Sequence, residues 1–144
     1  MLLTINIQDI DINYILYNKS TENNIIKNSE FVKILYSNDI YTLNSIIIDI
    51  NFKYINVAYK YNKVYFTFDA SKNIDIISRL VDLENNLLNL LNESNLKPLY
   101  NLKNLFLLKN FLAVNYKNNQ NNVYLKISGI WKNTKNYGLI FKFI

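Results

Sequence analysis

The last part of the chain, residues 123–144, constrains the fold most, because apolar and polar side chains alternate there in two consecutive runs. The apolar members of the two runs are Val123, Leu125, Ile127, Leu139, Phe141 and Phe143. A period of two is typical of strands that are buried on one face. The polar stretch between the runs, residues 132–136, is long enough to close a hairpin. We therefore expect a C-terminal β-hairpin that closes a small sheet.

One of the two glycines in the chain, Gly129, lies inside the first run. A glycine within a strand often marks a β-bulge, which moves the side chains beyond it to the other face. Simple alternation places Trp131 in the core, whereas a bulge at Gly129 places it on the opposite face. Tyr124, Lys126 and Lys142 have the opposite parity to the apolar residues, and we expect them at the surface.

Several earlier segments also have the composition of strands, with β-branched and aromatic residues bounded by turn-forming residues. These segments are residues 2–7, 31–36, 40–50, 52–59, 64–68 and 111–116. The polar stretch 60–63 joins two of them, which predicts a second hairpin that is rich in tyrosine. The three consecutive isoleucines at residues 46–48 predict a strand that is buried on both faces.

In the middle of the chain, apolar residues recur every three or four positions, which is the period of an amphipathic helix. We expect this helix at about residues 73–94, with Ser71 or Asn73 supplying the N-cap oxygen. It should end before Pro98, because a proline disfavours helical geometry in the residue that precedes it. Residues 99–108 fit either a short helix or a covering loop.

The predicted order of elements is several strands, one helix and further strands. This order indicates a mainly β protein, in the β-rich part of the α+β class. The most economical arrangement is a small antiparallel β-barrel with the helix plugging one end. The chain has 144 residues, and 50% of them are hydrophobic, which is enough to bury one core. We therefore expect a single domain over residues 1–144.

The composition excludes several classes of chemistry. The chain has no histidine and no cysteine, so the usual hydrolytic triads, thiol nucleophiles and zinc sites cannot form. Its two glycines cannot supply a glycine-rich phosphate-binding loop. Asp9 and Asp11 share a face if their segment is extended, but solvated carboxylates explain them better than a metal site does. We predict no catalytic residues, no metal site, no cofactor and no enzymatic activity.

The sequence also gives expectations about location and partners. It contains no run of about 18 apolar residues and no signal-peptide pattern, so we expect an intracellular protein that does not engage a membrane. The net charge of +5 favours an anionic partner. About one residue in five is asparagine, and lysine, isoleucine and tyrosine are abundant. Because AT-rich codons specify these residues, genome composition is an alternative explanation of the lysines and tyrosines.

The positive signal is the interleaving of aromatic residues with lysines in the two hairpins. Flat rings stack on bases without sequence choice, and ammonium groups follow phosphates, as binding of a single strand requires. The candidate nucleic-acid-binding residues are Tyr54, Tyr59, Lys60, Tyr61, Lys63, Tyr124, Lys126, Trp131, Lys132, Lys135 and Lys142. Cross-strand packing is the alternative role of such rings. We favour packing for Tyr65, Phe66 and Phe68, and leave both roles open for Tyr59 and Tyr61.

The terminal hairpin resembles a known family. Its G-I-W at residues 129–131 and G-L-I-F-K at residues 138–142 are similar to the last hairpin of phage-type single-stranded DNA-binding proteins of nucleo-cytoplasmic large DNA viruses. In that family a G-I-W segment precedes a G-L-x-x-K segment. The order of strands, a leucine-rich helix and strands also resembles the family, and the AT-rich composition suits such viruses.

This resemblance implies an OB-like barrel that binds single-stranded nucleic acid, with DNA favoured over RNA, without sequence specificity or catalysis in viral replication or repair. It implies a location in the host cytoplasm or nucleus, or in a viral factory. The alternative is a structural or protein-interaction component of a large DNA virus, such as a virion or assembly protein, on the same barrel. Homodimerisation and binding to replication proteins are further open possibilities.

Overall fold

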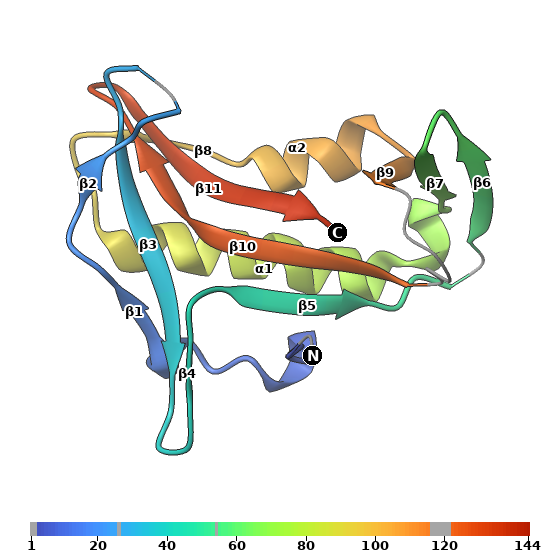
Figure 1. Cartoon of the computed structure of the whole chain (residues 1–144), viewed down its shortest axis with the longest axis horizontal. Coiled ribbons are helices and arrows are strands. Elements are labelled where there is room, and N and C mark those ends of the chain that lie inside the picture. Colours follow the sequence, from blue (N-terminus) through green and yellow to red (C-terminus); the bar gives the residue numbers. More distant parts are fainter. Residues whose placement is uncertain (1–2, 26, 54, 116–121) are drawn as a thin grey trace.

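The computed structural model describes residues 3–25, 27–53, 55–115 and 122–144. These residues form two β-sheets and two α-helices around one hydrophobic core (Figure 1). The predicted mainly β class is therefore confirmed. Neither sheet closes on itself in the described part of the chain, so a barrel is not confirmed. The expectation of purely antiparallel pairing is wrong, because one pair of strands, β8 and β11, is parallel.

The C-terminal hairpin lies at the centre of the larger sheet. The strands of this sheet are β1 (Ile15–Tyr17), β2 (Thr21–Glu22), β3 (Glu30–Ser37), β4 (Thr42–Leu43), β5 (Ile46–Ile50), β8 (Lys97–Leu99), β10 (Val123–Lys132) and β11 (Asn136–Phe143). β10 pairs with β11 on one side and, on the other, with β5 along its first half and β3 along its second half. The predicted hairpin is confirmed, and it organises the sheet.

A β-bulge interrupts β10 at the predicted place. Ile127 pairs with Phe141, but Gly129 pairs with Ile140, so β10 has one extra residue between these two pairs. Before the bulge the residues of odd number are buried, whereas beyond it Ile130 is fully buried and Trp131 is partly exposed. The bulge therefore moves Trp131 to the face opposite the core, which is the second of the two alternatives that the sequence left open.

The smaller sheet contains β6 (Asn56–Lys60), β7 (Lys63–Thr67) and β9 (Phe111–Asn115), in the order β6-β7-β9. The turn between β6 and β7 consists of Tyr61 and Asn62, whose φ angles are 51° and 60°. Two positive φ angles are those of a type I′ turn, whose twist matches a two-residue hairpin. The second predicted hairpin is thus confirmed. Val64 and Phe66 of β7 face the core.

The amphipathic helix is confirmed as α1 (Ile74–Leu91), which packs Leu80, Leu87 and Leu88 into the core. The prediction of its N-cap is wrong. The side chain of Asn73 makes no capping hydrogen bond. Its Oδ1 accepts from the Lys53 amide at 2.7 Å, and its Nδ2 donates to the backbone carbonyls of Lys53 and Asp69. Asn73 therefore holds two loops together instead of capping the helix.

Residues 99–108 contain a helix, α2 (Asn101–Leu108), which directly follows β8. Glu84 of α1 is fully buried, and its carboxylate accepts from the backbone amides of Leu102 at 2.8 Å and Lys103 at 2.9 Å. These two amides belong to the first turn of α2, where no intrahelical partner is available. A side chain of one helix thus caps the next, and this explains a carboxylate in the core.

The N-terminal segment differs from its prediction. No strand forms over the described part of residues 2–7, where a single bridge joins Ile5 to Ile48. Instead the chain makes the 3-10 turns η1 (Ile7–Asp9) and η2 (Ile12–Tyr14), with a third, η3 (Ala70–Lys72), before α1. The side chains of Asn6 and Asp11 accept from amides two residues ahead and thereby favour turns over a strand.

Two further details of the fold concern exposure. Ile46 and Ile48 are fully buried, but Ile47 between them is partly exposed, so the prediction of burial on both faces is wrong. The reason is that the face of β5 that carries Ile47 is not covered by a helix.

No helix among the described residues has both the length and the apolar character needed to cross a membrane.

Candidate nucleic-acid interface

The larger sheet has one covered face and one open face. The helices pack against the face that carries Leu125, Ile127 and Ile130, and in Figure 1 α1 passes behind β10. On the opposite side, no described element lies in front of β10 and β11 in this view. We call this side the open face; it carries Phe31, Lys33, Tyr124, Lys126, Trp131 and Lys142.

Two aromatic side chains lie side by side on the open face. Phe31 of β3 and Trp131 of β10 are direct partners in the register of the two strands. A Cβ atom at Gly129 would lie 2.6 Å from Cε2 of Phe31, and one at Gly138 would lie 3.2 Å from Nε1 of Trp131. Each ring therefore rests on the backbone of a glycine. We call Phe31 and Trp131 the aromatic platform.

A side chain does not fit at Gly129 and would be tightly packed at Gly138. The chain has only two, and both lie beneath the platform. At Gly129 an added Cβ would also lie 2.3 Å from the carbonyl oxygen of Val32, which is closer than any non-bonded contact allows. Both platform residues stay partly exposed. Each ring thus contacts the sheet and keeps part of its surface open, as stacking requires.

Three lysines share the open face with the platform. Lys33 of β3 pairs with Gly129, and Lys126 of β10 pairs directly with Lys142 of β11. Like charges at directly opposed positions of a sheet destabilise it. An anion between Lys126 and Lys142 would remove that repulsion. The arrangement therefore favours a negatively charged ligand along β10.

Tyr124 lies toward the far end of the open face. It is seven residues before Trp131 on the same strand, and a rise of about 3.3 Å per residue separates the two by roughly 23 Å. On β5 its partner is Asp49, an acidic residue. The basic surface thus extends from the platform past Lys126 and ends near Asp49.

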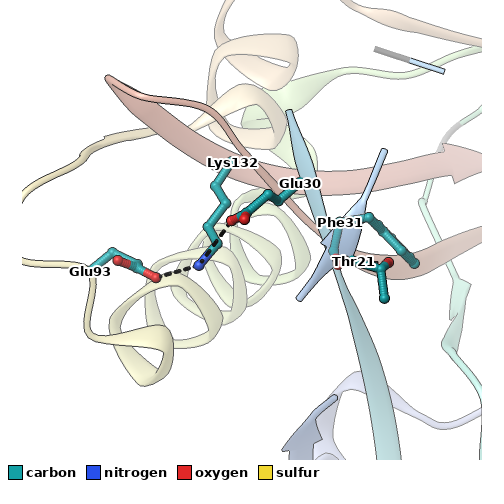
Figure 2. Close-up of polar contacts among 5 residues, drawn as sticks. All are labelled: Thr21, Glu30, Phe31, Glu93 and Lys132. Carbon is teal, nitrogen blue, oxygen red and sulfur yellow. Dashed lines mark hydrogen bonds and ion pairs between the residues drawn. The ribbon is translucent and has the colours of Figure 1, made fainter. Parts of the chain in front are cut away.

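Lys132 does not share the open face, although it directly follows Trp131. Its Nζ lies 2.9 Å from Oε1 of Glu93 and 3.6 Å from Oε2 of Glu30. Figure 2 draws both contacts as dashed lines. The hydrogen bond to Glu93 raises the pKa of the Lys132 ammonium, and the charge of Glu30 adds to this effect. The ion pairs join the centre of the sheet to the loop after α1. Lys132 is therefore engaged within the protein.

Figure 2 also shows the edge of the sheet beside the platform. Thr21 of β2 donates from its hydroxyl to the backbone carbonyl of Phe31 at 3.4 Å. The backbone pairing of Thr21 with Phe31 supports the strand that carries the platform ring, and the long hydroxyl contact adds little to it.

The other candidates form a second group at the tip of the β6–β7 hairpin. Figure 1 places this hairpin and the turn between β10 and β11 at opposite ends of the molecule. The exposed fractions of Tyr59 and Tyr61 are 61% and 84%, and Lys60 Nζ lies 5.2 Å from the centroid of the Tyr61 ring. Together with Lys63 these residues line an open hollow. They are not continuous with the aromatic platform.

The remaining predictions concern the aromatic residues assigned to packing and two further binding candidates. Phe66 and Phe68 are buried, as expected for packing residues, and Tyr65 contacts Phe111 at a centroid distance of 6.0 Å. Lys135 is exposed in the turn between β10 and β11. Tyr54 lies outside the described residues.

Sequence reasoning missed Phe31 and Lys33. The signal was present, because both alternate with the buried residues Val32, Ile34 and Tyr36 of β3. What the sequence could not give was the pairing of β3 with the end of β10, which brings Phe31 beside Trp131.

Among the described residues, no group of three acidic side chains is placed to hold a metal ion. Comparisons with protein-family models, curated proteins and solved structures gave no match.

Proposed function

We propose that this protein binds single-stranded nucleic acid on the open face, without sequence specificity and without catalysis. The observation that carries the proposal is the aromatic platform, with both glycines of the chain beneath its two rings and Lys33 beside it. Stacking on an aromatic side chain contributes about 1–3 kcal/mol per base and accepts every base, because each base has a flat face.

In this proposal the strand follows β10. Two bases stack on Trp131 and Phe31, while Lys33, Lys126 and Lys142 neutralise phosphates. The roughly 23 Å between Trp131 and Tyr124, at about 3.4 Å per stacked nucleotide, corresponds to about seven nucleotides. This length lies within the site sizes of about 4–16 nucleotides that small single-strand-binding domains use. The tip of the β6–β7 hairpin offers additional stacking to longer strands.

The resemblance to viral single-stranded DNA-binding proteins supports DNA as the ligand and replication or repair as the process. The residues that carry it include Gly129, Trp131, Gly138 and Lys142, and all four belong to the open face. A location in the host cell, at the site of viral replication, follows from the same resemblance.

Trp131 provides a direct test, because it is the only tryptophan in the chain. We expect its fluorescence to be quenched, to saturation, when oligo-dT is added at low salt, since stacking on a base changes the environment of the indole. A duplex of the same length serves as the control and should quench much less. If oligo-dT at tens of micromolar leaves the emission unchanged, the proposal is wrong.

A second candidate function is that of a structural or protein-interaction component. It is favoured by apolar side chains along the groove between α1 and α2 and at the end of α2. The exposed fractions of Ile74, Leu107 and Leu108 are 63%, 72% and 83%. Retention of a stable protein partner after nuclease treatment, without quenching of Trp131 by oligo-dT, would favour this function over nucleic-acid binding.

A further inference from the structure

The strand β6 is an edge that no described strand covers. It pairs with β7 on one side only, and Figure 1 places it at the extreme end of the molecule. All five of its residues are exposed. Val57 and Tyr59 pair with the buried residues Phe66 and Val64, yet their own exposed fractions are 43% and 61%. The apolar inner surface of the smaller sheet is therefore left unfinished at this edge.

Proteins usually protect such edges with proline, inward-pointing charges, bulges or a covering element. β6 has no proline and no bulge, and its single charged residue, Lys60, stands at its end. An uncovered edge of this kind is a template for another strand.

We propose that β6 pairs with β6 of a second copy of this chain, antiparallel and centred on Ala58. This alignment is the one that pairs all five residues of the strand. Ala58 then faces Ala58 of the second copy, and Val57 faces Tyr59, which is a favourable β-branched and aromatic pair. Asn56 faces Lys60, so no like charges meet. The strand is thus complementary to itself, as a two-fold symmetric interface requires.

The interface would be small. It joins two five-residue strands, whereas stable complexes bury about 1,200–2,000 Å². The dimer should therefore be weak and increase with protein concentration. It would convert two three-stranded sheets into one of six strands and place two open faces in one particle. On a long single strand, two linked sites bind more tightly than either alone.

The absence of cysteine from the chain permits a clean cross-linking test. Directly opposed residues of antiparallel strands have Cα atoms about 4.5–5.5 Å apart, which a disulfide can bridge. Ala58→Cys should therefore form a disulfide-linked dimer under mild oxidation. The matched control is Ala113→Cys, an exposed alanine on β9 at the opposite edge of the same sheet. Equal rates of cross-linking for the two variants would overturn the proposal.

Charge substitutions test the register without cysteine. Asn56→Glu places a carboxylate opposite Lys60 of the second copy and should increase the dimer fraction in sedimentation velocity. Asn56→Lys places two ammonium groups opposite each other and should decrease it. The control pair, Asn104→Glu and Asn104→Lys on the exposed surface of α2, makes the same charge changes away from β6. If the two Asn56 variants differ no more than the Asn104 pair, the β6 interface does not exist. A wild-type protein that stays monomeric at the highest attainable concentration would overturn the proposal as well.

Discussion

The structure separates two lysines that the sequence places on one strand, and this separation can be measured. Lys126 lies on the open face opposite Lys142, whereas Lys132 is held by Glu93 and Glu30. We expect Lys126→Gln to weaken the salt dependence of oligo-dT binding and Lys132→Gln to leave it unchanged. The reason is that only a lysine that neutralises a phosphate in the complex releases a counterion.

The magnitude follows from the lysines on the open face. Three phosphate contacts, by Lys33, Lys126 and Lys142, give a slope of about −2.1 for log K against log salt, since each contributes about −0.7 with a single strand. Between 50 and 200 mM salt the wild-type protein should thus lose about 18-fold in affinity. Lys126→Gln leaves two contacts, a slope of about −1.4 and a loss of about 7-fold.

The assay is a fluorescence-anisotropy titration of labelled oligo-dT at four salt concentrations. Lys132→Gln should retain the wild-type slope and instead lower the free energy of unfolding by roughly 1 kcal/mol, because it breaks two partly exposed ion pairs. An unchanged slope in Lys126→Gln, or a reduced slope in Lys132→Gln, would refute the assignment of the open face.

Substitutions at three further residues probe the platform and the core. Trp131→Ala should weaken oligo-dT binding about 5- to 140-fold by the loss of one stacked base, and Trp131→Phe should restore most of it in the same anisotropy assay. Gly129→Ala should lower the free energy of unfolding in urea by about 1–3 kcal/mol, because the new methyl group meets the Val32 carbonyl; a wild-type midpoint would contradict this. Burial raises the pKa of Glu84 above its ordinary value of 4.5. Between pH 4.5 and the higher pKa of Glu84 in the folded protein, the folded protein holds a proton that the unfolded chain releases. The stability contributed by this group therefore falls as pH rises through this range. Urea titrations from acid to neutral pH should show this contribution as a difference: the stability of the wild-type protein relative to Glu84→Gln should decrease as pH rises.

Local patterns in the sequence were sufficient to predict the elements whose structure depends mainly on their own residues. The terminal hairpin follows from strict alternation, and α1 follows from leucines at helical spacing. Even the bulge at Gly129 was visible, because a glycine in a strand has few other uses. The consequence for Trp131 was correctly posed as two alternatives, since one extra residue exchanges the two faces of a strand.

Other features depend on contacts between distant segments. β8 is three residues long and contains Pro98, and it becomes a strand only because β11 is beside it. Glu84 looks like a solvated residue on a helix until α2 places two amides against it. Lys132 looks like a phosphate ligand until Glu93, 39 residues earlier in the chain, is brought to it. No local pattern carries such information.

The use of glycine links the fold to the proposed function. Four described residues outside glycine have a positive φ, namely Asn28, Tyr61, Asn62 and Asn92, and neither glycine does. Glycine normally takes such positions because it has no Cβ to clash. This chain fills these positions with asparagine and tyrosine. Its two glycines instead lie where a Cβ atom would be crowded by neighbouring groups. At each glycine the atom nearest to an added Cβ is a backbone carbonyl oxygen, that of Val32 at 2.3 Å or that of Leu99 at 3.1 Å, and the ring of Phe31 or Trp131 is the next nearest group. The two residues that lack a side chain thus permit the close approach of the neighbouring backbone and, on the open face, contact with the two rings, and genome composition alone does not explain that placement.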